Sequence, residues 1–197
     1  MKTLWSLYSS CALLVVLITG PGVGQEPIGM GWYHPMPYPY VGENRKWGYT
    51  DSSGIQVVQP QYDLAGPFKE GLASVKKGDK WGYINEKGVE MIPLQFEVAA
   101  PFSEGLAAVK KDGKWGYINA KGAKAIDFVH DMAGAFSEGL SAVKKDGKWG
   151  YIDTKGRKII DYKYDVADNF SEGIAGIEIG GKWGYIDTSG EEVITPQ

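Results

Sequence analysis

The sequence predicts an all-β protein made of tandem three-stranded antiparallel meanders. Three observations support this: a constant repeat period, glycine-rich turn signals inside each period, and short alternating strands between the turns. The tetrapeptide KWGY recurs every 34 residues, with its tryptophan at Trp47, Trp81, Trp115, Trp149 and Trp183. A fixed period of this size marks one supersecondary unit in tandem copies, each burying its apolar face against its neighbours.

Helical arrays can share this period, but glycine excludes them here. The unit from Gly105 to Glu138 contains five glycines, each of which would cost ~1 kcal/mol in the interior of a helix. The unit therefore cannot supply two helices.

The turns divide each unit into strands. Asp112-Gly113 is typical of a two-residue type I′ hairpin, and Asn119 to Gly122 of a turn capped by its Asx side chain and closed by a left-handed glycine. In this unit we expect strands at 106–111, 114–119 and 123–126, followed by a connector. Val41 precedes Trp47 by the same interval as Val109 precedes Trp115, which predicts a short opening strand at Tyr40-Val41. The chain then has five meanders and four connectors.

Period-two alternation places Trp115 and Tyr117 on one face of the middle strand and Gly116 and Ile118 on the other. Glycine weakens a strand interior unless another group needs the space. We therefore expect Gly116 to make room for a ring or backbone of the adjacent unit.

The five units could form an open, curved array or a closed five-bladed propeller-like ring. Propeller blades usually have four strands, whereas 34 residues supply three, and both ends complete whole meanders. The open array is the favoured prediction, and the ring remains the alternative.

The N-terminal region differs from the repeats in composition. Residues 1–24 combine Lys2, an apolar stretch at 4–18 and the small residues Gly22 and Gly24, which predicts a cleaved signal peptide. Retention as a membrane anchor is the minor alternative, because the densest apolar run is too short for a spanning helix. Residues 25–39 read as a Pro/Tyr/Gly-rich linker, and 40–197 as the repeats. The expected location is secreted or in the cell envelope.

Cleavage after Gly24 would remove Cys11, the only cysteine, so stability must come from packing rather than disulfides. It would also remove one basic residue, Lys2, and change the net charge from −3 to −4. This mild acidity argues against nucleic acid as a partner.

The recurring string KWGYI, a short Asx-x-Lys-Gly turn and YDxAxxFSEGLAAVK resembles the WG-repeat family, also called KWG repeats. The resemblance covers roughly residues 40–197. It implies a β-rich repeat module, often on exported proteins, with no catalytic residues and no general ligand. Two departures stand out, Thr50 in place of the usual Ile and the connector sequence Asp127 to His130 in the third unit.

The repeat-defining residues are the first candidate site. A row of indoles could stack sugar rings, but aromatic side chains more commonly form the core between units. We expect a structural role for Trp47, Gly48, Trp81, Gly82, Trp115, Gly116, Trp149, Gly150, Trp183 and Gly184.

Lysines form a second row that could meet an anionic surface. The alternative is a solvated hairpin edge whose like charges oppose aggregation. The possible interaction surface consists of Lys80, Lys114, Lys148 and Lys182, with Lys46 in the first unit.

Catalytic and metal sites find little support in the sequence. The connector acids Asp63, Glu97, Asp131 and Asp165 recur as calcium ligands might, but they lack a dense ligand run, and turn capping explains them better. His130 is the one repeat-region histidine that could act as a base, and a catalytic site needs more than one reactive group. We expect no enzyme activity, cofactor or metal.

The leading functional hypothesis is an exported interaction module whose partner is a protein. The alternative is a carbohydrate or cell-wall polysaccharide binder that uses the repeat aromatics. Membrane contact beyond the signal segment is not expected.

Overall fold

The computed structural model describes residues 37–197, and all regular structure there is β-strand, in five antiparallel sheets. The first sheet has three strands, β1 (Tyr38–Val41), β2 (Trp47–Thr50) and β3 (Gln56–Tyr62). The second has β4 (Leu64–Lys69), β5 (Leu72–Lys77), β6 (Lys80–Asn85) and β7 (Glu90–Phe96). The third has β8 (Val98–Ala99), β9 (Leu106–Lys111), β10 (Lys114–Asn119) and β11 (Lys124–His130). The fourth has β12 (Met132–Ala133), β13 (Leu140–Lys145), β14 (Lys148–Asp153) and β15 (Lys158–Tyr164), and the fifth has β16 (Val166–Ala167), β17 (Ile174–Ile179), β18 (Lys182–Asp187) and β19 (Glu192–Ile194).

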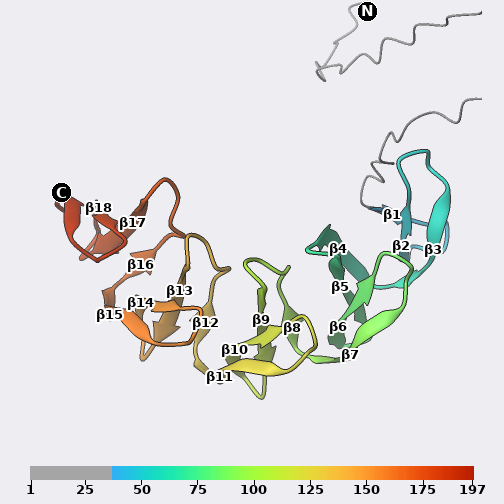
Figure 1. Cartoon of the computed structure of the whole chain (residues 1–197), viewed down its shortest axis with the longest axis horizontal. Helices are drawn as coiled ribbons and strands as arrows, with labels where there is room; N and C mark the ends of the chain where they lie inside the picture. The colour runs from blue at the N-terminus through green and yellow to red at the C-terminus, as the bar shows by residue number, and fades with distance from the viewer. Residues whose placement is uncertain (1–36) are drawn as a thin grey trace, which may run out of the picture. The chain divides into compact units, whose positions relative to one another are not determined.

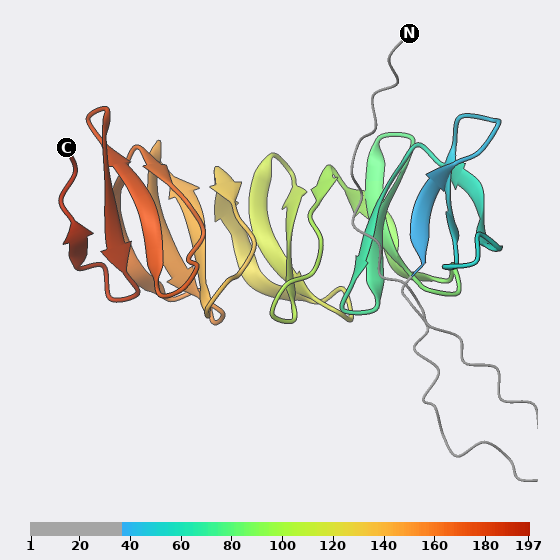
Figure 2. The ribbon, with the colours of Figure 1, turned by 90° about the horizontal axis from the view of Figure 1, so that it is seen from above.

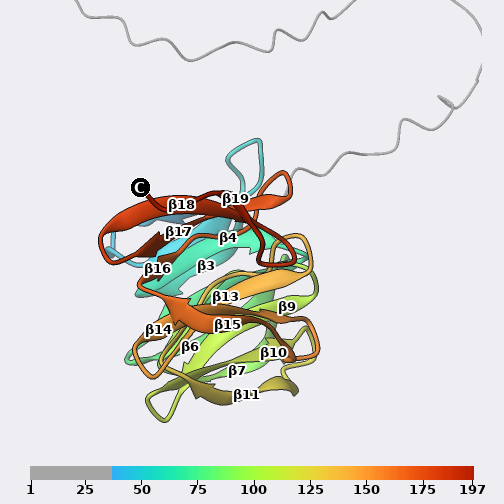
Figure 3. The ribbon, with the colours of Figure 1, turned by 90° about the vertical axis from the view of Figure 1, so that its left-hand side faces the viewer.

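The sheets follow one another in chain order, and each packs on the next (Figure 1). The outer strand of one sheet contacts a central strand of the following sheet: β3 with β5, β7 with β9, β11 with β13, and β15 with β17. The first and fifth sheets lie at opposite ends of the row (Figure 2). The array is therefore open, as predicted, and the closed ring does not form. Figure 3 looks along the row from the fifth sheet.

Each connector adds a fourth strand that was not predicted from the sequence. The predicted meander supplies the three longer strands of each sheet, and β4, β8, β12 and β16 come from the connectors. Three of these additions are only two residues long, too short to leave an alternating pattern. The first sheet has three strands in the described part of the chain.

The predicted turns are confirmed. Asp112 and Gly113 both have positive φ, 51° and 78°, as a type I′ hairpin requires. In the second turn, the Asn119 carboxamide oxygen accepts hydrogen bonds from the amides of Lys121 and Ala123. A further tight turn lies at the end of each connector, where Glu104 and Gly105 also have positive φ. Sequence reasoning did not identify that turn because glutamate rarely adopts this conformation.

The opening strand exists, but its register differs by one residue from the other sheets. Val41 pairs with Trp47, whereas Val109 pairs with Gly116. A one-residue shift moves every side chain to the opposite face. Tyr40, opposite Gly48, therefore takes the place on the outer face of the first sheet that a valine takes elsewhere.

The glycine of each KWGY motif makes room within its own sheet. A Cβ on Gly82 would lie 2.6 Å from the Ile92 carbonyl oxygen and 2.8 Å from the Leu94 amide nitrogen. The strand pair β6–β7 is irregular here, since its register shifts between Trp81 and Tyr83. This bulge brings the β7 backbone over the glycine. The expectation that the space serves an adjacent unit was wrong, because the intruding backbone belongs to the same unit.

A buried tyrosine links each sheet to the next. The Tyr83 hydroxyl donates a hydrogen bond of 2.7 Å to the Ala100 carbonyl oxygen in the following connector. Its ring centroid lies 4.9 Å from that of Phe102 in the same connector, at an interplanar angle of 60°. The same ring pair occurs at every junction: Tyr49–Phe68, Tyr83–Phe102, Tyr117–Phe136 and Tyr151–Phe170.

Replacing the motif glycine should destabilise the array. Gly82→Ala forces the β7 backbone away from its bulge, and overpacking of this kind costs ~1–3 kcal/mol. Gly54→Asn is the control, because Gly54 has open space around it and asparagine tolerates positive φ, so its cost should stay below about 1 kcal/mol. Denaturant unfolding followed by circular dichroism measures both. Equal costs would contradict the steric explanation.

Removing the tyrosine hydroxyl should lower the free energy of unfolding only where the hydroxyl donates a hydrogen bond to the following connector. Tyr83→Phe leaves the Ala100 carbonyl without its partner and should cost ~1–3 kcal/mol. Tyr185→Phe is the matched change in the fifth sheet, where the side chain is exposed, and should cost less than about 0.5 kcal/mol. Thermal melts of the two variants compare them directly, and a larger loss for Tyr185→Phe would refute the connector contact.

Candidate interaction surfaces

The tryptophan row belongs to the junctions between sheets. Trp47, Trp81, Trp115 and Trp149 are half-buried and pack against the inter-sheet clusters. The expected structural role remains a prediction, and the tyrosine two positions later is more deeply buried than the tryptophan. Trp183 differs, since it lies in the fifth sheet and is 47% exposed.

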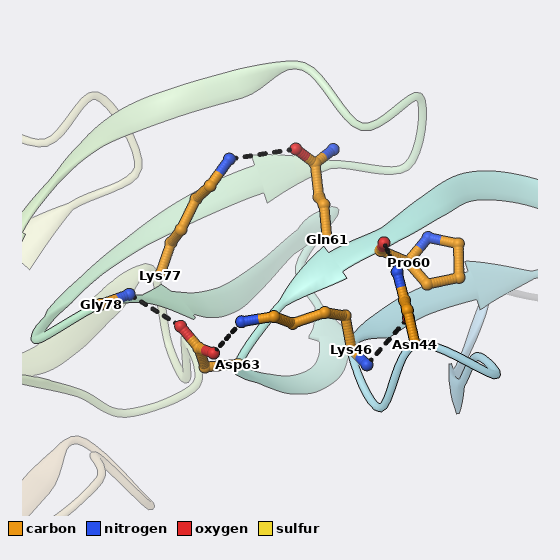
Figure 4. A network of polar contacts seen from close by, with 7 residues as sticks. All are labelled: Asn44, Lys46, Pro60, Gln61, Asp63, Lys77 and Gly78. Atoms are coloured by element: carbon orange, nitrogen blue, oxygen red, sulfur yellow. Dashed lines mark hydrogen bonds and ion pairs between the residues drawn. The ribbon is translucent and has the colours of Figure 1, made fainter.

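The predicted lysine row is partly neutralised within the protein. Lys46 makes an ion pair with Asp63, which also accepts a hydrogen bond from the Gly78 amide at 2.7 Å (Figure 4). Lys114 pairs with Asp131 at 2.6 Å, and Lys148 with Asp165 at 2.5 Å. These lysines cross-link one unit to the next connector, which leaves less of their charge for a partner. Lys80 and Lys182 have no ion pair in the described part of the chain.

The connector acids cap turns, but the turn that each caps is the hairpin about 15 residues further along the chain rather than the local turn that the sequence predicted. Asp63, Glu97 and Asp165 each accept a hydrogen bond from the amide of a hairpin glycine, at 2.7, 3.0 and 2.8 Å. The hydrogen bond from Lys46 lowers the pKa of Asp63, and the one from Lys148 lowers that of Asp165. Their oxygens are thus engaged in holding the repeat junction. Among residues 37–197, no group of three or more His, Cys, Asp or Glu side chains is placed to hold a metal ion.

A second set of acids links successive units. The carboxylate of Glu70 accepts a hydrogen bond from the Gly105 amide at 3.0 Å. Glu104 and Glu138 repeat this contact with the glycine amides 35 residues further on. The constant spacing of Glu and Gly was the available signal.

His130 is a structural residue in an unusual position. It pairs with Trp115 where Phe96 pairs with Trp81 in the preceding sheet, and it is only 4% exposed. Its Nδ1 has no hydrogen-bond partner, and burial, with a contribution from Lys145, lowers its pKa. A shallow hollow of about 320 Å³ lies beside it, lined among others by Asp127, Lys145 and Tyr162. These neighbours are titratable, but none of them makes a hydrogen bond to the histidine Nδ1.

The outer strands carry a row of exposed apolar side chains that sequence reasoning missed. The second residue of each full-length outer strand, and its counterpart in β19, points outward at 34-residue intervals. We call Val57, Met91, Ala125, Ile159 and Val193 the outer-strand row. Met91 is 49% exposed and Ile159 is 43% exposed. The doublets Val57-Val58 and Ile159-Ile160 were the signal, because alternation sends only one member of each doublet to the core.

Five consecutive sequence matches to the family described as WG containing repeat cover residues 47–81, 81–115, 115–149, 149–183 and 183–197. The chain belongs to the WG-repeat family. The matched residues begin at the first KWGY tryptophan and continue to the end of the sequence. The predicted family and its five repeats are confirmed. No curated protein matched the WG-repeat chain in a sequence search.

The WG-repeat array is similar in fold to solved β-propeller-like structures. Hsv2 of Kluyveromyces lactis gives a TM-score of 0.52 at 9% identity, over 81% of this chain and 57% of that one. A form of KlHsv2 with loop 6CD replaced by a Gly-Ser linker gives 0.54 at 10% identity, over 79% and 62%. A structure described as the eukaryotic initiation factor gives 0.53 at 11% identity, over 81% and 50%.

The chain thus spans about half to three fifths of the length of these structures. At this level of identity, the likeness concerns the fold alone. Family and fold together are those of a β-rich repeat module. The predicted signal segment and residues 25–36 of the predicted linker lie outside the described residues. Within residues 37–197, no helix is long and apolar enough to span a membrane.

Replacing the buried histidine should stabilise the array and flatten its pH dependence. His130→Phe copies Phe96 and removes a buried nitrogen without a partner, which should gain ~1–3 kcal/mol. Since the folded pKa of His130 lies below its usual 6.5, the unfolded chain takes up the proton first, and wild-type stability falls as pH drops below 6.5 towards the folded pKa. Denaturant midpoints between pH 5 and pH 8 measure this, with His34 present in both proteins. An unchanged slope would contradict the assignment.

Proposed function

We propose that the chain is an exported, non-enzymatic module that binds another protein through its stacked surface. The outer-strand row carries this proposal. It presents exposed apolar side chains at one register position of successive sheets. An interaction surface forms where exposed apolar side chains join into one patch, and the repeat of the row from sheet to sheet would supply such a patch.

A protein partner fits this surface better than a glycan does. The row consists of aliphatic side chains and a methionine, which pack against apolar side chains of a partner. Glycans instead favour open aromatic faces, and four of the five repeat tryptophans are half-buried at the sheet junctions. The exposed Trp183 is the one observation that favours the carbohydrate alternative.

The absence of a paired catalytic set supports a non-enzymatic role. Residues repeated in every unit hold junctions together, and His130 Nδ1 makes no hydrogen bond to the titratable side chains in its hollow. Export rests on the sequence of residues 1–24.

A photo-crosslinking amino acid placed at Met91, in cells that make the protein, tests the proposal. We expect one protein to be captured at Met91, and not from the matched exposed position Glu86 in the turn of the same sheet. Adding Ile159→Lys should reduce capture, because it buries a charge in the interface. The mass of the recovered bait also tests cleavage after Gly24.

Equal capture from both positions would refute the outer-strand row as a binding surface. A glycan array distinguishes the alternative function. Saturable glycan binding that Trp183→Ala abolishes, without any captured protein, would favour the carbohydrate hypothesis.

A further inference from the structure

The fifth sheet exposes the face that every other sheet buries against its successor. Ile174, Trp183, Tyr185 and Ile194 are 40–47% exposed, and we call this set the C-terminal face. Strand pairing places them together. Tyr185 lies opposite Ile194, and Trp183, two residues before Tyr185 in β18, lies on the same face of the sheet. In the second sheet, the residues at three of these positions, Leu72, Tyr83 and Ile92, are at most 7% exposed.

The fifth repeat also reverses the charge pattern of the repeats before it. Residues 164–197 contain seven acidic residues and one basic residue, Lys182, a net charge of −6 within a chain of net charge −3. The lysine pairs before the hairpin turn, such as Lys144-Lys145, become Glu178-Ile179. Glu178 lies opposite Trp183 in the β17–β18 pairing and therefore shares the C-terminal face. Its carboxylate has no ion-pair partner among the described residues.

The preceding sheet contains the contact that this change removes. There, the Lys144 ammonium lies 6.0 Å from the centroid of the Trp149 ring. A cation in that position is attracted by the negative face of the indole. At the same place in the fifth sheet, Glu178 stands beside Trp183, so a cation there would have to come from another molecule.

We propose that the C-terminal face binds a basic segment of a partner protein, in which lysine or arginine alternates with aliphatic residues. The aliphatic side chains cover Tyr185 and Ile194, and a cationic side chain lies between Glu178 and the Trp183 ring. The inference rests on the proposed role in protein binding, but it uses a surface separate from the outer-strand row.

Charge decides between this occupant and others. Two copies meeting through their C-terminal faces would bring two acidic repeats together, and like charges across an interface oppose association. Anionic polymers are repelled in the same way. A basic segment instead gains attraction from the acidic repeat.

The direct test uses the full chain and a nine-residue peptide of alternating lysine and valine, with isothermal calorimetry as the readout. We expect saturable binding that weakens with added salt, and none for the matched glutamate–valine peptide. Glu178→Lys restores the residue of the other repeats and should weaken binding by about tenfold or more. Glu86→Lys makes the same charge change in a distant turn and should leave binding unchanged within about twofold.

Several outcomes would overturn the inference. These are equal binding of the two peptides, equal weakening by Glu86→Lys, or dimerisation of the free chain that Ile194→Asp abolishes. Capture at Met91 together with failure of the peptide would leave the proposed function intact and remove only the C-terminal face. Peptide binding without capture at Met91 would support the C-terminal face and remove the outer-strand row as a binding surface.

Discussion

The array depends on the contact between a buried tyrosine and the connector that follows its sheet. At each junction, the hydroxyl donates to a backbone carbonyl of the next unit, and the ring packs on the phenylalanine of the same connector. Burial raises the pKa of Tyr83, which keeps the hydroxyl in its donating form. The contact joins a central strand to the connector after its sheet, so it fixes both the spacing of the sheets and the position of the fourth strand. Folding of one unit thus favours folding of the next.

Each residue of the motif that defines the family has a different structural role. The tyrosine faces the following unit, the isoleucine after it faces the preceding one, and the tryptophan covers the edge of the junction. The glycine lets the third strand cross closely over the second at a bulge. No larger residue could serve there without displacing that backbone, because a carbonyl oxygen of the third strand lies 2.5–2.8 Å from the position of the missing Cβ in every unit.

Local chemistry made much of the fold predictable. Turn residues and the repeat period are local signals, and they correctly predicted the all-β fold class, the turns and the open array. The connector strands were not predictable, because two residues such as Val98 and Ala99 pair only when the preceding sheet positions them. The register of β1 was not predicted because the first turn, at Asn44-Arg45, lacks the glycine of the later turns and closes between Gly42 and Lys46. Sequence identified the lysine row, but its neutralisation by Asp63 and Asp131 required the relative placement of neighbouring units.

The outer faces of the first and fifth sheets are chemically different. Repeat arrays need terminal units with polar outer faces, because the stacking surface is otherwise apolar. The first sheet meets this need with Thr50 where Ile84 stands in the second, and with Tyr40, whose hydroxyl donates to Gln56 across its outer face. The fifth sheet keeps the apolar stacking residues and surrounds them with acids instead. Charge at the rim of an apolar face preserves solubility while leaving that face accessible, and a capped face at one end with an accessible face at the other is the arrangement expected of a binding surface.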